Sequence, residues 1–392
     1  MLRFATSGES HGEALLATLS GIPAGLKIDQ RFLDRELWRR QQGYGRGGRM
    51  KIERDTAQPL AGVRHGKTIG APIAIRLENK DWKNWEEALP VGEGDPAKHR
   101  PVESPRPGHA DLAGALKYNF PEARYVLERA SARESAARVA VGAVAKLFLR
   151  ELGVEVLSHV VAVGGAAVQD SKISWERVRA LYDREEVLLN CADYEAEQRM
   201  KKAVDEALKT GDSVGGVFEV VAHGVPPGLG TYANWDERLD GLLAQAMMSL
   251  QAVKAVEIGD GVHAAASPGS AVHDEIAYDA SITGPLRFTR RSNHAGGIEG
   301  GISNGEEIRL RAYVKPISTL RRPLGSVSFA TRQPVEAAYE RSDVCVVPAA
   351  GVGGEAMVAL TLARCALEKF GGDSMIETLR NFQGYLEQLR TF

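Results

Sequence analysis

The residues best suited to chemistry stand at positions 39–54, where the sequence reads RRQQGYGRGGRMKIER. Five arginines and one lysine alternate there with four glycines. Glycine lets a backbone approach a ligand closely, and the guanidinium group presents a planar fork of donors that matches carboxylate and phosphate oxygens. Because the formal charge of the whole chain is only -2, this positive charge is local. The segment therefore predicts a site for a small anionic ligand rather than for a long polyanion.

Two histidines stand next to small residues and have charged neighbours. His11 lies in SGESHG, close to Glu9, and His109 lies in RPGHAD, between Arg106 and Asp111. An imidazole exchanges a proton near neutral pH, so either histidine could act as an acid or a base. Each one alone is explained as well or better by a histidine in an exposed turn. The two histidines together are more informative than either one alone.

Three further segments could bind anions or could be structural only. RASARES at 129–135 opens a predicted helix, where free N–H groups attract anions, but Ser131 could equally serve as an N-cap. SNHAGGIEGG at 292–301 is glycine-rich, which alone is a weak sign of phosphate binding. Arg341, Ser342 and Asp343 precede an apolar run and could be an ordinary surface ion pair.

Composition limits the class of protein. The 392 residues are 44% hydrophobic and 26% charged, which is typical of a globular chain with a large core. No apolar run reaches the roughly 18 residues that a membrane span needs, and the N-terminus lacks the pattern of a signal peptide, so we expect a cytoplasmic protein. The three cysteines, Cys191, Cys345 and Cys365, are far apart and outside any CxxC pattern. We therefore expect neither disulfides nor a metal site.

The elements that must position these residues alternate between strands and helices. Hydrophobic periodicity predicts strands at 14–19, 73–77, 217–222, 306–315 and 344–347. It predicts helices from near Asp29 to Gly43 and at 131–152, 193–208, 234–251, 355–370 and 376–389. Residues 81–106 read as a long loop, and 348–354 as a turn.

The expected strand at 306–315 is the clearest of these. Ile308 and Leu310 fall on one face, and Arg309 and Arg311 on the other, which predicts a half-buried strand with a basic outer face. No internal repeat or shift in composition marks a boundary, so we interpret residues 1–392 as one large α+β domain, although the length would permit two.

Taken together, these segments resemble the chorismate synthase family from residue 3 to about residue 370. The motifs that carry the resemblance are GESHG at 8–12, RRQQGYGRG at 39–47, RPGHAD at 106–111, RASARE at 129–134, SNHAGGIEGGISNG at 292–305, KPIST at 315–319 and RSDVCVVPA at 341–349. Two positions depart from the pattern. Ala130 stands where many members have serine, and Ser342 where many have histidine, so position 342 is not expected to serve as an acid or base.

The resemblance implies a carbon–oxygen lyase at the last common step of aromatic amino-acid biosynthesis. Such an enzyme converts 5-enolpyruvylshikimate 3-phosphate into chorismate and phosphate by a 1,4-elimination that requires reduced FMN without net redox change. The implied fold is an α+β sandwich of the chorismate synthase type with helices enclosing sheets. The implied assembly is a homotetramer.

Roles for individual residues also follow from the resemblance. His11 would donate a proton to the departing phosphate, His109 would stabilise the reduced flavin, and Asp343 would assist removal of the substrate's C6 proton by way of flavin N5. The substrate-binding candidates are Ser10, Arg39, Arg46, Arg49, Arg106 and Arg133. The flavin-binding candidates are Ala130, Ser131, Ala132, Gln251, Ala252, Gly300, Lys315, Pro316, Ile317, Ser318, Thr319 and Arg341. The positions of Arg39 and Arg46 are also described in the family as contacts of NADP.

Other classes fit the sequence less well. A Rossmann dehydrogenase is disfavoured because neither GGIEGG nor GVGGEA lies in a βαβ unit with an acidic residue about 20 positions downstream. Nucleic-acid binding is disfavoured because the net charge is -2 and aromatic residues make up only 6% of the chain. One alternative stays open within the family, since some members reduce their own FMN with NADPH and arginines alone do not decide this.

Overall fold

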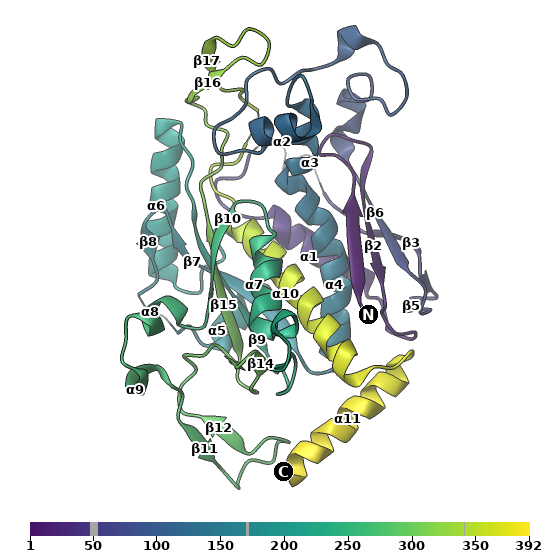
Figure 1. Ribbon diagram of the computed structural model, residues 1–392, viewed down its shortest axis with the longest axis vertical. Coiled ribbons are helices and arrows are strands. Elements are labelled where there is room, and N and C mark those ends of the chain that lie inside the picture. The colour runs from purple at the N-terminus through teal and green to yellow at the C-terminus, as the bar shows by residue number, and fades with distance from the viewer. Residues whose placement is uncertain (48–53, 170–171, 341) are drawn as a thin grey trace.

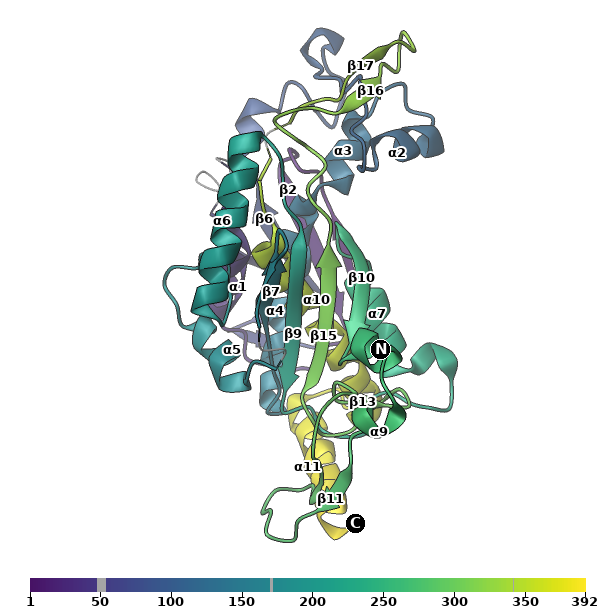
Figure 2. The same ribbon diagram turned by 90° about the vertical axis from the view of Figure 1, so that its left-hand side faces the viewer.

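Two antiparallel sheets flank a layer of long helices in the computed structural model, which describes residues 1–47, 54–169, 172–340 and 342–392 (Figure 1). The first sheet has the order β1 (Arg3–Ser7), β2 (Ala14–Ser20), β6 (Ile73–Glu78), β3 (Gln58–Ala61). The second has the order β10 (Val253–Ile258), β15 (Ile308–Val314), β9 (Gly216–His223), β7 (Glu155–Val163), β8 (Ala166–Ala167). Figure 2 shows the second sheet from its outer face.

Four helices pack between or beside the sheets, and others lie outside them. The inner helices are α1 (Gln30–Gln41), α4 (Ser135–Glu151), α7 (Leu239–Met248) and α10 (Val347–Phe370). The others are α2 (Asp111–Tyr118), α3 (Arg124–Ala130), α5 (Trp175–Tyr182), α6 (Tyr194–Thr210), α8 (Gly261–Ala265), α9 (Gly269–Val272) and α11 (Met375–Thr391). Short 3-10 turns are η2 (Lys80–Asn84), η3 (Pro96–Lys98), η4 (Ala132–Glu134) and η5 (Trp235–Glu237).

Small hairpins complete the described elements. They are β4 (Val63–Arg64) with β5 (Lys67–Thr68), β11 (Ile276–Tyr278) with β12 (Phe288–Arg290), β13 (Ile298–Glu299) with β14 (Ile302–Ser303), and β16 (Gly325–Val327) with β17 (Pro334–Glu336). The last hairpin stands at the upper end of the molecule, near α2 and α3 (Figures 1 and 2).

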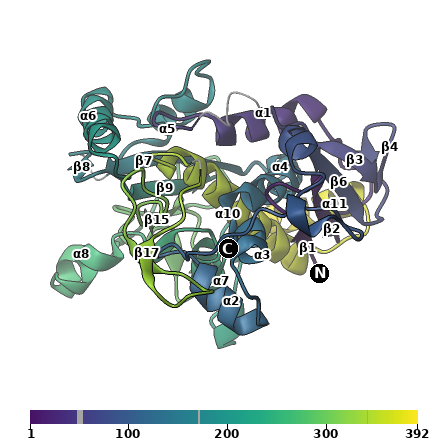
Figure 3. The same ribbon diagram turned by 90° about the horizontal axis from the view of Figure 1, so that it is seen from above.

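The α+β class is confirmed, but the order of the layers is the reverse of the one expected. Helix α4 packs on β2 and β6 of the first sheet, and α10 packs on β7 and β9 of the second, so the sheets enclose the helices (Figure 3). Both helices are apolar on nearly all sides, and such helices are stable only when other elements cover them. Helix α10 is also the one described helix long and apolar enough to cross a membrane by composition, and 78% of that window is buried inside the protein.

Strand β15 has the predicted alternation, with Ile308, Leu310, Ala312 and Val314 buried. The expected basic face is present but neutralised. Arg309 and Arg311 donate to Glu219 on β9 at 2.9 and 3.0 Å. Neighbouring strands thus supply the counter-charges, a pairing that the sequence of one strand does not reveal.

Several predicted elements differ at their ends. Residues 344–347 are not a strand, and the expected turn at 348–354 lies inside α10, which starts at Val347 with a proline in its first turn. The helix expected at 131–152 begins at Ser135, after the 3-10 turn that Ser131 caps. Strands β1, β7 and β10 and helix α3 were not predicted.

A small second cluster of apolar residues ties the upper segments together. Val102, Ala123 and Leu127 form its buried centre, and Phe329 and Ala338 pack against it. Phe329 N donates to Glu103 O at 2.9 Å, which joins the β16–β17 hairpin to the 81–106 loop. This loop is therefore anchored to the rest of the chain, and it leads directly into the segment that carries His109.

Candidate active site

A cluster of arginines meets the end of α1. Arg40 stands in the last turn of this helix, and its Nη2 lies 3.3 Å from Asp55 Oδ2. Arg133, from η4, donates to the same oxygen at 2.6 Å. Arg46 is near enough for its charge to act on Arg40. We call Arg40, Arg46, Arg133 and Asp55 the arginine cluster.

The arginine cluster concentrates positive charge in a buried place. Burial lowers the pKa of Arg40 to about 10; Arg133 and Arg46 add to this effect, and Asp55 opposes it. Arg40 Nε and Asp55 Oδ1 are buried and have no hydrogen-bond partner in the described part of the chain. Because buried polar atoms are nearly always paired, the cluster is suited to a ligand that brings an anionic oxygen and a donor.

Two serines connect the arginine cluster to the loop between β1 and β2. Ser131 caps η4 by accepting from Arg133 N at 3.2 Å, and its Oγ donates to Ser10 Oγ at 3.1 Å. Asn79 supports the same loop, because its amide group donates to the carbonyls of Glu9 and Gly12 while its oxygen accepts from Arg133 Nε at 3.0 Å. The loop that carries His11 is therefore held against the arginine cluster.

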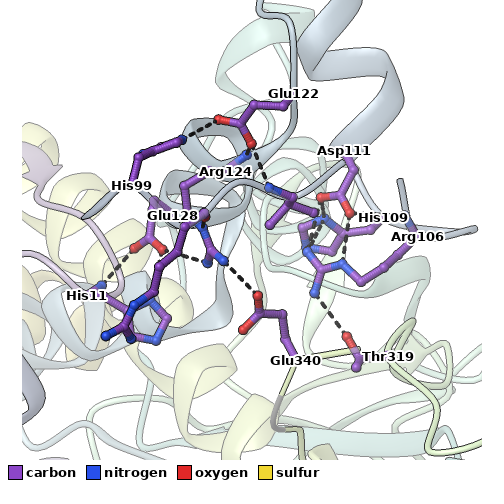
Figure 4. A network of polar contacts seen from close by, with 12 residues as sticks. His11, His99, Arg106, His109, Asp111, Glu122, Arg124, Glu128, Thr319 and Glu340 are labelled. Atoms are coloured by element: carbon purple, nitrogen blue, oxygen red, sulfur yellow. Dashed lines mark hydrogen bonds and ion pairs between the residues drawn. The ribbon is translucent and has the colours of Figure 1, made fainter. Parts of the chain in front are cut away.

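His11 is held by the buried carboxylate of Glu128 (Figure 4) and by an aromatic ring. Its Nδ1 lies 2.8 Å from Glu128 Oε1, and its backbone N donates to Glu128 Oε2 at 2.8 Å. The imidazole stacks on Trp85 with ring centroids 4.1 Å apart. Burial raises the pKa of Glu128, but the hydrogen bonds and charge of His11, with help from Arg124, outweigh burial and hold that pKa below its ordinary value.

His109 belongs to a second histidine–carboxylate pair (Figure 4). Its Nδ1 lies 2.5 Å from Asp111 Oδ1, and Arg106 Nε donates to Asp111 Oδ2 at 2.8 Å. Arg106 Nη1 also donates to Thr319 at 2.9 Å. Burial opposes ionisation of Asp111, yet the hydrogen bonds from His109 and Arg106 hold its pKa far below its ordinary value. The RPGHAD segment is thus fastened to the end of the KPIST segment.

Residues 251 and 252 connect the KPIST segment to Glu134, at the end of the RASARE segment. Lys315 N donates to Ala252 O at 2.9 Å, and Gln251 Nε2 donates to Glu134 Oε2 at 3.0 Å. Lys315 Nζ donates to Gly108 O at 2.7 Å and Ser318 Oγ at 3.1 Å. Most of the predicted flavin-binding residues therefore lie along one connected set of contacts: Ala130, Ser131, Ala132, Gln251, Ala252, Lys315, Pro316, Ile317, Ser318 and Thr319.

Asp343 pairs with the glycine-rich segment after α1. Arg46 Nη1 lies 2.9 Å from Asp343 Oδ2, and Gly47 N donates to Asp343 Oδ1 at 2.5 Å. Val344 N donates to Gly45 O at 2.8 Å. The predicted residues Arg46 and Asp343 are brought together, and Arg46 links them to the arginine cluster.

Arg39 lies apart from the arginine cluster. Its two terminal nitrogens donate to Glu355 at 2.6 and 2.7 Å, and Lys146 pairs with both Glu355 and Glu36. Arg39 therefore completes a buried ion-pair network between α1, α4 and α10. Binding of a ligand by Arg39 would require this network to open, so we propose Arg40 as the ligand contact in place of the predicted Arg39.

Among the described residues, one other predicted residue is not brought to the site. Gly300 lies between β13 and β14, near the start of β15, whereas Lys315 follows its end. Arg49 and Arg341 fall outside the described residues. A cavity of about 490 Å³ also lies near the start of β15, lined by Lys172, Glu219, His223, Asp260, Arg309 and others, away from both histidine pairs.

Arg40, Asp55 and Glu128 were missed by sequence reasoning. For Arg40 a signal was present, because Glu36 stands three residues before Arg39 on the same helix face and so marks Arg39 as a paired residue. Asp55 and Glu128 become informative only once the fold brings them to Arg40 and His11 from distant parts of the chain.

Comparisons with known proteins show the family of this chain. A family model for chorismate synthase matches residues 2–367. The chorismate synthase of Koribacter versatilis is 72% identical over 396 residues, and that of Acidobacterium capsulatum is 68% identical over 394 residues; both matches cover 100% of each chain. A crystal structure of chorismate synthase aligns with a TM-score of 0.79 at 42% identity, covering 100% of this chain and 99% of the other.

The fold and these relatives define an enzyme of the carbon–oxygen lyase class. The chain belongs to the chorismate synthase family. Its reaction, the formation of chorismate from 5-enolpyruvylshikimate 3-phosphate, is the last common step of aromatic amino-acid biosynthesis.

Proposed function

We propose that the chain performs this elimination at the upper end of the sandwich, with reduced FMN as cofactor. The observation that carries the proposal is the arginine cluster, in which Arg40 and Arg133 share the buried carboxylate of Asp55 and Arg46 lies near enough for its charge to act on Arg40. Such a site needs an anion to balance its charge. The substrate brings a phosphate and two carboxylates, which suits this cluster.

The residues near Lys315 fit the phosphate of FMN. Among the described residues, Lys315 Nζ donates to two neutral oxygens only, and burial together with the charge of Lys254 lowers its pKa. A cation with a cationic neighbour and no carboxylate partner favours an anionic ligand. Ser318 and Thr319 offer hydroxyl groups on the same segment. Reduced FMN, when bound there, would lend electron density to the substrate as phosphate leaves.

The chain's own groups can then act on the substrate. Arg40, Arg46 and Arg133 would hold the phosphate and stabilise the negative charge that develops as its bond to C3 breaks; one preorganised donor contributes on the order of 3 kcal/mol. His11 would give its proton to the departing phosphate. Asp343 would assist removal of the C6 proton. The proton lost from C6 balances the proton gained by phosphate, so the reaction needs no external acid.

His109 would serve the cofactor rather than the substrate. Its partner Asp111 also binds Arg106, and Arg106 reaches Thr319 of the proposed cofactor segment. A positively charged pair of His109 and Arg106 beside this segment would stabilise an anionic reduced flavin. This role differs from that of His11, which pairs with Glu128 and lies in the loop between β1 and β2.

NADPH is a second cofactor only if the enzyme reduces its own flavin. Arg46 is a candidate contact, whereas Arg39 is engaged with Glu355 in the described structure. Anaerobic turnover with NADPH and oxidised FMN as the sole source of electrons would establish this activity. We expect none for a monofunctional enzyme, for which dithionite-reduced FMN alone supports turnover.

The proposal extends to a cytoplasmic homotetramer. Gly300 lies at the opposite end of β15 from Lys315, so a flavin contact by Gly300 would have to come from a second copy of the chain. This separation supports an oligomer. Sedimentation velocity of the purified protein tests it, with four times the 42.3 kDa chain mass as the expected result.

The division of the site can be tested with two variants. We expect Arg133→Ala to weaken binding of 5-enolpyruvylshikimate 3-phosphate by about tenfold or more with little effect on FMN, because a charge-assisted hydrogen bond contributes about 1.5–3 kcal/mol. We expect Lys315→Ala to weaken the binding of FMN instead. Titrations monitored by flavin fluorescence and by calorimetry measure both. Equal losses of both ligands in either variant would contradict the assignment.

A further inference from the structure

The carboxylate of Glu128 makes an unusual pair of contacts with one histidine. Oε1 lies 2.8 Å from His11 Nδ1, and Oε2 accepts from the backbone N of His11 at 2.8 Å. The Glu128 side chain is 1% exposed and the His11 side chain 13%. Both oxygens thus bind His11, which lies in a loop 117 positions before Glu128 of helix α3, and Oε1 also accepts from Arg124 Nη1 at 3.4 Å.

These contacts fix the protonation pattern of the imidazole. The pKa of Glu128 lies below its ordinary value, so the carboxylate is ionised and can only accept hydrogen bonds. Nδ1 must therefore carry a proton, which leaves Nε2 as the atom that gains or loses one. Stacking on Trp85, itself flanked by Arg100 and Arg124 at 4.6 and 5.1 Å from the ring, limits rotation of the imidazole.

We propose that Glu128 is the positioning residue of the catalytic acid: it holds His11 as the Nδ1–H form and directs Nε2 toward the departing phosphate. The inference rests on the proposed function, in which His11 protonates phosphate. In the step, the Nε2–H bond breaks, an O–H bond forms on phosphate, and His11 is left neutral with Nδ1–H still donated to Glu128. The proton removed from C6 restores the balance.

The chain offers a matched control in the same segment. Glu122 also faces a histidine, with Oε1 3.2 Å from His99 Nε2, and its Oε2 accepts from the backbone N of Val102 at 2.8 Å (Figure 4). His99 is not assigned to the reaction. Glu122→Gln therefore makes the same chemical change at a histidine–carboxylate pair without touching His11.

The substitution Glu128→Gln leaves the size of the side chain unchanged but removes one acceptor. The single amide oxygen can then accept from only one of the two N–H groups of His11, the backbone N–H or the Nδ1–H. The amide NH₂ group faces the other. We expect kcat to fall by about tenfold or more with KM changed less than about twofold, because only proton transfer is impaired. Glu122→Gln should keep the wild-type kcat. Glu128→Asp should recover part of the loss of Glu128→Gln.

A double-mutant cycle separates positioning from a general structural effect. If Glu128 acts through His11, Glu128→Gln should cause no further loss of kcat in a His11→Ala background. Losses that multiply in the double variant, or a wild-type kcat in Glu128→Gln, would overturn the inference.

A measurement without turnover distinguishes this inference from the proposed function. In protein labelled with ¹⁵N-histidine, the resonances missing from His11→Ala identify His11, and their shifts report which nitrogen carries the proton. We expect the Nδ1–H form in the wild type and Glu122→Gln, and its loss in Glu128→Gln. An unchanged Nδ1–H form in Glu128→Gln would overturn the inference even if His11 is the acid. A normal kcat in His11→Ala would instead overturn the acid role in the proposed function.

Discussion

At the scale of single residues, neighbouring positions on one helix have opposite roles. Arg39 is engaged with Glu355 and Glu36 in the interior, whereas Arg40 reaches Asp55 in the arginine cluster. Successive helix residues point about 100° apart, so two adjacent arginines cannot serve the same site equally. The sequence motif contains both arginines, and only the fold separates Arg39, which pairs in the interior, from Arg40, which we propose contacts the ligand.

Substitution of these two arginines should have different consequences. Arg39→Met should lower the free energy of unfolding by about 3 kcal/mol, because the fully buried Glu355 loses a partner. Arg40→Met should instead raise KM for the substrate by about tenfold, the equivalent of about 1.4 kcal/mol of lost binding. Urea unfolding and steady-state kinetics measure the two effects. A large rise in KM for Arg39→Met with normal stability would reverse the assignment.

The two histidines should both be needed for rate rather than for binding. General acid–base catalysis contributes about 10²- to 10⁴-fold to the rate of a reaction. We therefore expect the kcat of His11→Ala and of His109→Ala each to fall by at least about 10²-fold while substrate binding persists. Stopped-flow phosphate release under anaerobic conditions gives kcat, and calorimetry gives substrate affinity. A near-normal rate in either variant would remove that histidine from the scheme.

At the scale of elements, α10 is the part that the sequence describes least well. Its first residues contain Pro348, Gly351, Gly353 and Gly354, which read as a turn. In the structure Gly354 packs against the ring of Phe218, where an added Cβ would lie 2.5 Å from a ring carbon. Glycine is therefore required for the close approach of α10 to β9, and local sequence cannot distinguish this need from a turn.

Other elements follow from sequence more directly. Asp29 caps α1 as expected, and β15 alternates over its whole length, because caps and period-two patterns are local properties. In the site, motif order predicted His11, His109 and Asp343 before any geometry was known, and their roles stay predictions. The partners Glu128 and Asp55 could not be found in this way, since each acts on a residue that is distant in sequence.

Glu355 on α10 should give the fold a specific dependence on pH. Burial opposes its ionisation, but Arg39 and Lys146 outweigh burial and place its pKa at about 2, against an ordinary value of 4.5. A carboxylate whose pKa is lowered by folding stabilises the protein above its unfolded pKa, and this contribution is lost as the pH falls from about 4.5 toward about 2. Glu355→Gln should therefore be less stable than the wild type at pH 7.

The stability difference between the wild type and Glu355→Gln should shrink as the pH falls through the same interval. Chemical unfolding at a series of pH values between about 5 and 2.5 measures it. A constant stability difference over this range would show that the pKa of this carboxylate is not lowered by folding.

At the scale of the whole molecule, one continuous core joins both sheets. Leu19 of the first sheet, Val358 of α10 and Phe218 of the second sheet belong to the same buried cluster. Helices α4 and α10 therefore cannot lose one sheet without exposing apolar surface. This arrangement supports the expectation that residues 1–392 form one domain.

A single domain should unfold in one step. We expect one calorimetric transition with coincident loss of secondary and tertiary signals, since the largest buried cluster of the described residues joins both sheets through α4 and α10. Two well-resolved transitions with a folded intermediate would favour two domains.

We propose that the upper end of this sandwich eliminates phosphate from 5-enolpyruvylshikimate 3-phosphate with reduced FMN. Phosphate and chorismate can be measured together in one anaerobic reaction. We expect one phosphate for each chorismate, turnover only when dithionite-reduced FMN is present, and flavin that is still reduced at the end. No phosphate release under these conditions, or consumption of one reduced flavin for each chorismate, would contradict it.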